Sequence, residues 1–474
     1  MPNPNILSER YATEEINSIF SEENIALAER SLWIEIMKAQ RRIGMEIPAE
    51  DIEKYVAAKS RIDLELIKEI EKKTRHDVKA RIEAFVRAAG AGEYIHLGMT
   101  SRDLTDNVEQ MQLKQAARII FGKYLSVLRH LVDKSKEYKQ IVLTARTHHQ
   151  PAQPTLLGRR FSMWAEELLI HLHDFEAFIN NYPLRGVNGA VGTQSDMLEL
   201  LGTRANVEEL NQIIATSLGF SRCLASTGQV YPRSLDYKLV SMLSLLASAC
   251  EGFAKTMRLM CGYELLTEGF KPGQVGSSAM PHKMNTRSCE RICALAELLK
   301  MYADGASRIA GDQWEEGDVS CSALRRVVLP DAFYCSDGLC ETTLTVLNEM
   351  GPYPAVIERE LKRYLPFLAT TKLLMLAVKA GLGREEAHEA IKRHAVKQAL
   401  EMREGREPRF AEGVADDSLF RKAGMTREKI KAAISDTSEL LGNAEEQIEV
   451  VAENAGRLIN KYKKESAYEP RGIV

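Results

Sequence analysis

Apolar residues recur at helical spacing over long stretches of this chain, and few stretches alternate between apolar and polar positions as a half-buried strand does. Proline is scarce inside these stretches. The pattern predicts a mainly α protein whose longest helices run for about 25 to 32 residues, which corresponds to rods of roughly 40 to 48 Å. Rods of this length bury their apolar faces against one another, so we expect a central bundle of long helices. The four predicted long helices span residues 108–139, 156–181, 235–263 and 290–314.

The predicted helix over residues 235–263 is apolar nearly all round, with serine, alanine and glycine interspersed. Such a helix is expected in the middle of the bundle or at an interface between subunits. Shorter helices are predicted before Gly90 and after Gly351, and the tail after Lys461 is expected to fray. The three expected domains are an N-terminal helical domain (residues 1–104), a central long-helix bundle (105–350) and a C-terminal helical domain (351–474).

Most residues with chemically useful side chains fall in the segments that separate the predicted helices. We therefore expect a functional site to form at helix ends rather than on helix faces. These segments span residues 90–106, 144–155, 182–196, 269–286 and 315–322.

Composition and charge argue against several classes of protein. The chain carries 63 basic and 66 acidic residues, a formal net charge of -3. Nucleic acids and anionic membranes demand a basic excess, so neither is expected as the main partner. No run of residues reaches the roughly 20 apolar positions of a membrane span. The first residues, Met-Pro-Asn-Pro-Asn, lack the basic and apolar regions of a secretory signal, so we expect a cytoplasmic protein.

All eight cysteines lie between Cys223 and Cys340, and none belongs to a Cys-x-x-Cys pair. This distribution argues against a disulfide framework and against a zinc knuckle, and it favours reduced thiols in a packed core. Cys289 and Cys293 lie four residues apart with His282 nearby, which leaves a metal site as an alternative.

The segment from Pro272 to Glu290 combines several kinds of chemistry in a stretch too rich in glycine and proline to be helical. Its small residues at positions 276–279 allow a close approach of the backbone to a ligand. Lys283 provides a point charge for a carboxylate, and Asn285 provides an orientable donor and acceptor. An ordinary surface loop would explain the glycine and serine equally well, so composition alone leaves both interpretations open.

Two further motifs precede this loop in the chain. In the motif Arg75-His76-Asp77, the histidine suits a positioned acid, base or hydrogen-bond donor, but a surface salt-bridge cluster would look the same. The run from residue 96 to residue 103 places Thr100 and Ser101 ahead of a long helix. This arrangement suits an anion site and also a plain N-cap.

A third motif, Thr-His-His-Gln-Pro-Ala-Gln-Pro at residues 147–154, places two histidines and two glutamines before a helix expected to begin near Thr155. Histidine beside proline in a loop is hard to explain by packing, so a functional role is favoured here.

Together these motifs resemble the adenylosuccinate lyase family of the fumarase/aspartase superfamily. The sequence Gly-Ser-Ser-Ala-Met-Pro-His-Lys-Met-Asn at residues 276–285 resembles the superfamily's signature loop. Arg-His-Asp-Val at 75–78, Thr-His-x-Gln-Pro-Ala-Gln at 147–153 and Gly-Gln-Val-Tyr-x-Arg at 228–233 resemble this family specifically. The likeness extends over nearly the whole chain.

The resemblance implies β-elimination of fumarate from adenylosuccinate, giving AMP, and from the succinylated aminoimidazole carboxamide ribotide (SAICAR), giving AICAR, in purine nucleotide biosynthesis. The expected partner is thus a small nucleotide substrate, and no metal or other cofactor is expected. Family members form homotetramers in which three chains build each site. The same is expected here, because the motifs spread from residue 75 to residue 290 on rods whose ends lie far apart.

The roles of individual residues follow from the same resemblance. His148 is the expected general acid, Glu290 the carboxylate that pairs with it, and Ser277 the general base. The expected catalytic set is His148, Ser277, Ser278, Glu290, His76 and Lys283, with Ser278 as the next candidate for the base. The expected substrate-binding residues are Arg10, Tyr11, Arg75, His76, Asp77, Thr100, Ser101, Gln229, Lys283, Asn285, Arg291, Ser322 and Arg326.

One position departs from the family pattern. Many relatives carry an arginine where this chain has Gly317, so a phosphate or ribose contact is expected from Arg325 or from another chain. Argininosuccinate lyase, or another superfamily member that releases fumarate, is the alternative enzyme. A non-catalytic relative and a metal-dependent hydrolase are alternatives from other classes, and retention of the expected acid and base weighs against the former.

Overall fold

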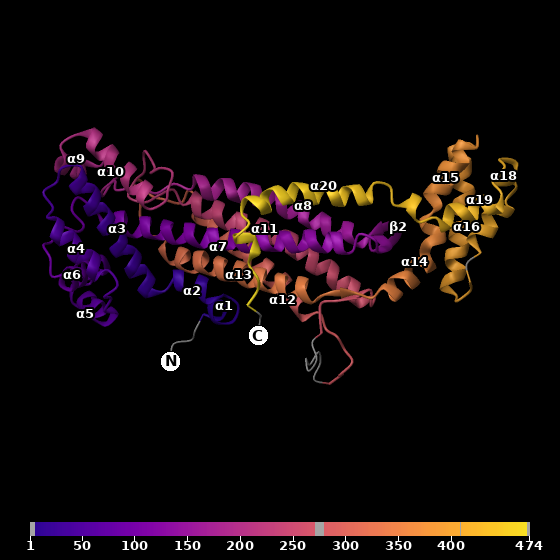
Figure 1. Ribbon diagram of the computed structural model, residues 1–474, viewed down its shortest axis with the longest axis horizontal. Coiled ribbons are helices and arrows are strands. Elements are labelled where there is room, and N and C mark those ends of the chain that lie inside the picture. Colours follow the sequence, from indigo (N-terminus) through magenta and orange to yellow (C-terminus); the bar gives the residue numbers. More distant parts are fainter. Residues whose placement is uncertain (1–4, 271–278, 408, 472–474) are drawn as a thin grey trace.

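A bundle of long helices occupies the middle of an elongated molecule, with shorter helices at both ends (Figure 1). The structure is a computed structural model that describes residues 5–270, 279–407 and 409–471; the predicted Ser277 and Ser278 lie outside the described residues. The predicted mainly α class with a central long-helix bundle is confirmed.

Five long helices form the bundle, and four of them lie where the periodicity predicts them. The fifth, α13, was not among the predicted rods; it contains Pro330, which interrupts the pattern of an ordinary helix. The predicted ends shift: the first rod begins at Ser101 rather than at 108, and the fourth ends at Ile309 rather than at 314. The five are α7 (Ser101–Glu137), α8 (Leu157–Asn181), α11 (Ser234–Gly262), α12 (Arg287–Ile309) and α13 (Ser322–Glu349).

The early start of α7 has a local cause. The Thr100 side chain and the Asp103 carboxylate form a capping box, in which Asp103 accepts a 2.7 Å hydrogen bond from the Thr100 N–H. This pairing satisfies N–H groups that would otherwise have no partner at the helix end. It therefore extends the helix back to the motif residues.

The apolar helix α11 lies against α8, α12 and α13 and buries Leu239, Leu243 and Leu246 among them. On another side it exposes Leu245 and Leu259, which are 49% and 51% accessible in the single chain. The helix thus contributes to the core and also presents an apolar surface.

The segment predicted as a loop over residues 144–155 is a β-hairpin. Strand β1 (Val142–Thr147) pairs antiparallel with β2 (Gln150–Leu156), and Thr147 lies opposite Gln150. The two residues between them, His148 and His149, have φ of 51° and 61°. A two-residue turn with both residues left-handed matches the twist of a hairpin. Helix α8 accordingly begins after β2, and a second small sheet pairs β3 (Leu266–Thr267) with β4 (Gly351–Pro352).

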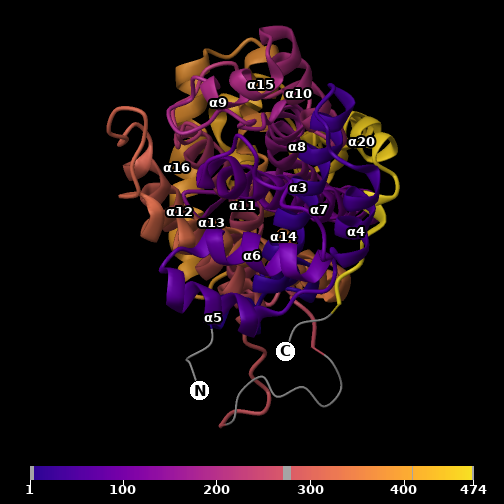
Figure 2. The same ribbon diagram turned by 90° about the vertical axis from the view of Figure 1, so that its left-hand side faces the viewer.

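Shorter helices cover both ends of the bundle (Figure 1), and one of these ends faces the viewer in Figure 2. Helices α1 (Ile6–Arg10) and α2 (Glu14–Ile19) lie along the side of the bundle against α13 (Figure 1). At one end lie α3 (Glu22–Arg42), α4 (Ala49–Ala58), α5 (Leu64–Thr74), α6 (Asp77–Ala89), α9 (Ser195–Leu201) and α10 (Arg204–Ser217). At the other lie α14 (Pro354–Leu368), α15 (Thr370–Lys379), α16 (Arg384–Arg403), α17 (Phe410–Asp416), α18 (Ser418–Lys422), α19 (Arg427–Ser435) and the 3-10 turn η1 (Ser438–Leu440). Helices α15 to α19 enclose an apolar core of their own.

Helix α20 (Ala444–Lys461) returns along the bundle beside α8, and the turn η2 (Glu465–Ala467) follows it (Figure 1). The expected fraying of the tail is wrong for residues 465–471. Ser126 on α7 donates a 2.6 Å hydrogen bond to the Tyr468 carbonyl, and Arg129 donates to the Ser466 carbonyl at 2.9 Å. These partners lie more than 300 residues away in the chain, so local sequence did not reveal them.

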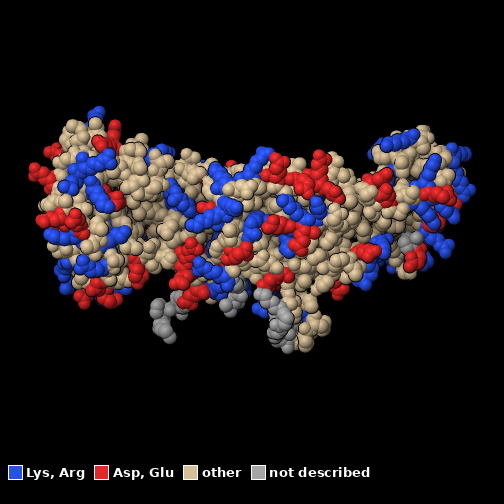
Figure 3. Space-filling view, in the orientation of Figure 1, with Lys and Arg blue, Asp and Glu red and all other residues tan. Residues whose placement is uncertain are grey.

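Basic and acidic side chains intermix along the face in view in Figure 3, over the bundle as well as its ends. Among the described helices, none combines the length and the apolar character needed to cross a membrane. The division into three domains, with boundaries near residues 104 and 350, stays a prediction.

Candidate functional site

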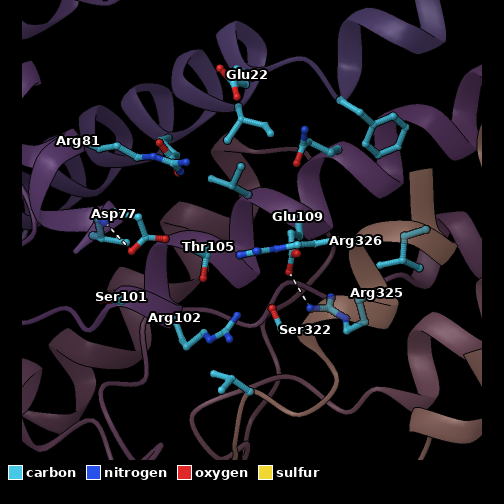
Figure 4. Close-up of a pocket in the computed structure, with 18 of the residues that line it drawn as sticks. Glu22, Asp77, Arg81, Ser101, Arg102, Thr105, Glu109, Ser322, Arg325 and Arg326 are labelled. Carbon is cyan, nitrogen blue, oxygen red and sulfur yellow. Dashed lines mark hydrogen bonds and ion pairs between the residues drawn. The ribbon is translucent and has the colours of Figure 1, made fainter. Parts of the chain in front are cut away.

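A cavity of about 830 Å³ opens where α3 and α6 meet the ends of α7 and α13. Polar side chains from these elements point into it (Figure 4). Seven residues predicted from sequence line the cavity, although they come from four separate stretches of the chain: His76, Asp77, Thr100, Ser101, Gln229, Ser322 and Arg326.

Thr100 and Ser101 stand at the N-terminus of α7, a helix of 37 residues. The first N–H groups of a helix carry a partial positive charge and have no partner within it. With the hydroxyl of Ser101 beside them, they suit a carboxylate or a phosphate.

Asp103, the last residue of the run from 96 to 103, organises this end of the cavity. Its buried carboxylate pairs with the guanidinium of Arg185 and accepts backbone N–H groups of Asn188 at 2.8 Å and Gly189 at 3.2 Å. The same carboxylate caps α7. One aspartate therefore joins the 185–189 turn to the helix that carries Thr100.

Gln229 reaches the cavity from a segment that packs closely on residues 313–317. Its N–H donates a 2.6 Å hydrogen bond to the Glu316 carbonyl. A Cβ on the preceding Gly228 would lie 2.1 Å from that carbonyl oxygen, so only glycine permits this approach.

His76 is the N-cap of α6, and its Nδ1 accepts a 3.2 Å hydrogen bond from the Lys79 N–H. This bond leaves the hydrogen of the neutral imidazole on Nε2. The side chain is 53% exposed and lines the cavity. The geometry therefore favours a neutral Nε2–H donor.

Adjacent arginines differ sharply in their surroundings. Arg325 is buried and donates to Asp236 at 2.7 Å, to Glu109 at 3.0 Å and to the Tyr231 hydroxyl at 2.5 Å. Arg325 also lines the cavity, and the suggestion that it replaces the arginine missing at Gly317 stays a prediction. Arg326 is exposed in the cavity, and no hydrogen bond or ion pair joins it to another residue of the described part of the chain.

The cavity residues that sequence reasoning missed include Glu29, Arg81, Arg102 and Glu109. Arg81 pairs with Glu29, and Arg102 donates to Asp106 at 3.3 Å. Burial raises the pKa of Glu29 to about 7, against the opposing effect of Arg81. Arg102 follows Ser101 directly, so the motif at residues 96–103 could have indicated that it belongs to the site. No local sequence feature indicates that Glu29, Arg81 and Glu109 line the same cavity.

Other predicted residues form separate groups. The His148 side chain is exposed at the tip of the β1–β2 hairpin, and this tip and α6 lie at opposite ends of the bundle (Figure 1). Arg75 is the left-handed C-cap of α5 and does not line the cavity.

A third group combines α1 with α12. The guanidinium of Arg291 lies 5.5 Å from the centre of the Tyr11 ring. Burial lowers the pKa of Arg291, Tyr11 opposes this effect, and the positive charges of Arg10 and Arg287 add to it. Arg10, Tyr11 and Arg291 therefore form one basic cluster.

The described part of the signature loop leads into α12. Lys283 and Asn285 precede the helix, and Glu290 lies in its first turn. The buried Glu268 caps this helix by accepting the N–H groups of Ser288 at 3.0 Å and Cys289 at 2.9 Å. Glu290 and His148 both belong to the part of the chain that the structure describes, and no hydrogen bond or ion pair joins them within this chain.

Cys289 and Cys293 are buried in α12, whereas His282 is exposed in the loop. Within the described ranges, no three His, Cys, Asp or Glu side chains are placed to hold a metal ion.

Known proteins match the chain over most of its length. Residues 11–297 match a family model described as "Lyase", and residues 366–451 match one described as "Adenylosuccinate lyase C-terminus". The adenylosuccinate lyase of Schistosoma mansoni is 33% identical over 94% of this chain and 93% of its own. That of Saccharomyces cerevisiae is 35% identical, covering 94% and 92%. That of Methanocaldococcus jannaschii is 33% identical, covering 83% and 85%.

Solved structures show the same fold at low identity. The 3-carboxy-cis,cis-muconate lactonizing enzyme of Pseudomonas putida superposes with a TM-score of 0.82 at 18% identity, covering 96% of this chain and 99% of its own. A fumarate lyase of Mesorhizobium gives a TM-score of 0.79 at 20% identity, covering 94% and 99%.

Proposed function

Since the chain belongs to the adenylosuccinate lyase family, as its motifs indicated, we propose that it releases fumarate from adenylosuccinate, giving AMP, and from SAICAR, giving AICAR. The observation that carries the proposal is the cavity in which the N-terminus of α7 faces Arg326, an arginine without a partner among described residues. A substrate with carboxylates at one end and a phosphate at the other fits such a pair of anion sites.

The reaction is a β-elimination. A base removes a proton from the succinyl carbon next to a carboxylate, the carbon–nitrogen bond breaks, and an acid protonates the departing nitrogen. Charge that develops on the carboxylate must be held by fixed donors and cations. We expect this carboxylate to be bound by Thr100 and Ser101 together with Lys283 and Asn285 of the signature loop.

His148 is the proposed acid and Ser277 the proposed base, with Ser278 as the alternative base. A carboxylate beside an imidazole raises the pKa of that imidazole and makes it a better proton donor near neutral pH. Glu290 takes this role only if it meets His148 from another chain, because no bond joins the two within one chain.

The nucleotide half of the substrate would be held by the remaining residues. Ser322 and Arg326 lie in the cavity, whereas the basic cluster on α1 and α12 would approach from another chain. His76 serves as a neutral donor, and Gln229 binds a polar edge of the substrate. The basic cluster consists of Arg10, Tyr11 and Arg291. Arg75 and Asp77, which flank His76 in the chain, are also proposed to bind the substrate.

We expect a homotetramer with shared sites. The cavity residues, the hairpin tip with His148 and the basic cluster of α1 and α12 lie apart within one chain. In addition, the bundle exposes apolar side chains that a partner would cover. These include Met163 and Ile170 on α8, Leu245 on α11 and Met301 on α12. Light scattering is expected to give a mass four times the 53.1 kDa of one chain, and an active monomer would contradict shared sites.

Incubation with adenylosuccinate is expected to release fumarate and AMP, and incubation with argininosuccinate is expected to release none. The reverse pattern would identify the alternative enzyme of the superfamily. Release from neither substrate would refute the proposed activity.

Replacing Arg326 with Met is expected to raise KM for adenylosuccinate by about 10- to 100-fold, because a charge-assisted hydrogen bond contributes about 1.5–3 kcal/mol. The fold should be unaffected, since Arg326 has no partner in the described structure. Steady-state kinetics measures the effect. Arg308→Met is the matched control, because Arg308 is also exposed on a long helix but pairs with Asp304 at 2.9 Å away from the cavity. An unchanged KM in R326M would exclude a role in binding.

A further inference from the structure

The middle of α13 joins the two ends of the described chain. We call residues 5–19 the N-terminal segment and residues 465–471 the C-terminal segment. On α13, Asp337 accepts the Thr13 N–H at 2.6 Å, and Glu341, one turn later, accepts the Arg471 N–H at 3.0 Å. The two segments thus bind to successive turns of one helix.

Lys123 on α7 is the buried link between these two carboxylates. Its side chain is 1% exposed, and its ammonium donates to Asp337, to Glu341 at 2.8 Å and to the Thr13 hydroxyl at 3.3 Å. Burial alone would lower the pKa of Lys123, but the two carboxylates raise it above its ordinary value. Lys123 therefore stays charged at neutral pH.

The N-terminal segment reaches α13 by close packing as well as by hydrogen bonds. A Cβ on Gly338 would lie 2.7 Å from the Tyr11 Cβ, so Tyr11 packs directly on the backbone of α13. Tyr11 in turn lies beneath Arg291 in the basic cluster. The position of Asp337 and Gly338 therefore determines where Tyr11 and Arg10 stand.

The C-terminal segment supplies the donors that the second carboxylate needs. The Tyr468 hydroxyl donates to Glu341, and the Tyr468 ring lies 4.7 Å from the Lys123 ammonium. The segment fits against α7 where Gly122 leaves room for Glu465. Arg471 also reaches Glu15 of the N-terminal segment at 3.7 Å.

One ammonium faces two buried carboxylates in this cluster, and a buried charge without partners is costly. The hydroxyl of Tyr468 and the N–H of Arg471 stabilise Glu341. Without the Tyr468 hydroxyl, Glu341 would compete more strongly with Asp337 for the Lys123 ammonium. The contacts that Asp337 and Lys123 make with Thr13 would then weaken.

We propose that the C-terminal segment is a positioning element for substrate binding: through Tyr468, Glu341, Lys123 and Asp337 it holds the N-terminal segment so that Arg10 and Tyr11 stand beside Arg291. The role in binding rests on the proposed function, in which this basic cluster helps to hold the nucleotide half of the substrate. Tyr468 acts through other residues and touches no substrate.

The test is Tyr468→Phe, which removes one hydroxyl and keeps the ring over Lys123. Hydrogen–deuterium exchange should rise in peptides that cover residues 5–19. KM for adenylosuccinate should rise about tenfold, as expected for a weakened charge-assisted contact, while kcat changes less than about twofold. A merely structural loss would lower the melting temperature without this separation of KM from kcat.

Tyr462→Phe is the matched control. The Tyr462 hydroxyl donates to Glu176 on α8 at 2.5 Å, so this variant also removes a hydroxyl from a glutamate, but away from Lys123. Its KM and its exchange over residues 5–19 should match the unmodified protein. An unchanged KM in Y468F, or equal changes in both variants, would overturn the proposal.

The two proposals fail in different ways. If the unmodified protein releases no fumarate, the proposed function fails and the role in binding fails with it, while the exchange comparison still decides whether the segments are coupled. If the exchange of residues 5–19 is unchanged in an otherwise active Y468F, the coupling is refuted and the proposed function stands.

Discussion

Replacing His148 with Gln is expected to lower kcat for fumarate release by about 10²- to 10⁴-fold, the usual contribution of a general acid. Glutamine keeps the size and a hydrogen bond but cannot deliver a proton to the leaving nitrogen. The fold should persist, because the His148 side chain is exposed at the hairpin tip and has no hydrogen-bond partner in the described chain. Fumarate formation by ultraviolet absorbance and melting by circular dichroism measure the two outcomes.

The hairpin provides its own control in His149→Gln. Both residues share the left-handed turn, so the two substitutions place equal strain on the backbone. The His149 ring lies 5.5 Å from the Tyr263 ring and faces its own chain. H149Q should keep most of the activity. Undiminished turnover in H148Q, or an equal loss in H149Q, would refute His148 as the acid.

Replacing Arg325 with Met is expected to lower the free energy of unfolding by about 3–5 kcal/mol, because removing one partner of a buried charge network leaves the others uncompensated. Arg325 holds Asp236 and Glu109 and donates to the Tyr231 hydroxyl. Its own pKa reflects this setting: burial alone would lower it, but these acidic groups raise it. Denaturant unfolding at one fixed protein concentration measures the loss, since assembly would shift apparent stability.

The neighbouring R326M variant is the natural comparison for R325M. The two substitutions are chemically identical and one residue apart, but only Arg325 is buried among acids. R326M should unfold like the unmodified protein and bind substrate poorly. Equal destabilisation by the two variants would show that the buried network contributes little to stability.

Local pattern predicted the helical class and four of the five long helices, because an amphipathic or apolar helix repeats over many residues. Features that depend on a few residues were harder to foresee. The capping box starts α7 earlier than the periodicity predicts. Pro330 interrupts the helical pattern of α13, so this helix was not predicted. The segment predicted as a loop is a hairpin, because His148 and His149 adopt left-handed conformations at its turn.

The candidate site shows the same division. Thr100 and Ser101 were predicted because adjacent residues form a recognisable anion motif at a helix start. Glu29 and Arg81 were not, since residues 52 apart in the chain meet only after α3 packs near α6. The predicted roles of Ser277 and Ser278 lie on residues outside the described structure.

The sequence by itself determined the class of fold, the family and the chemistry of each short motif, because these properties reside in neighbouring residues. Tertiary structure decided which motifs share a cavity. It also decided that Arg325 is bound to acidic residues whereas Arg326 has no partner among the described residues. Finally, it placed Lys123 between the two carboxylates of α13 that bind the N-terminal and C-terminal segments. The reason is physical: a side chain's charge and hydrogen-bonding capacity are intrinsic, but whether they remain available to a ligand depends on partners that folding brings from distant parts of the chain.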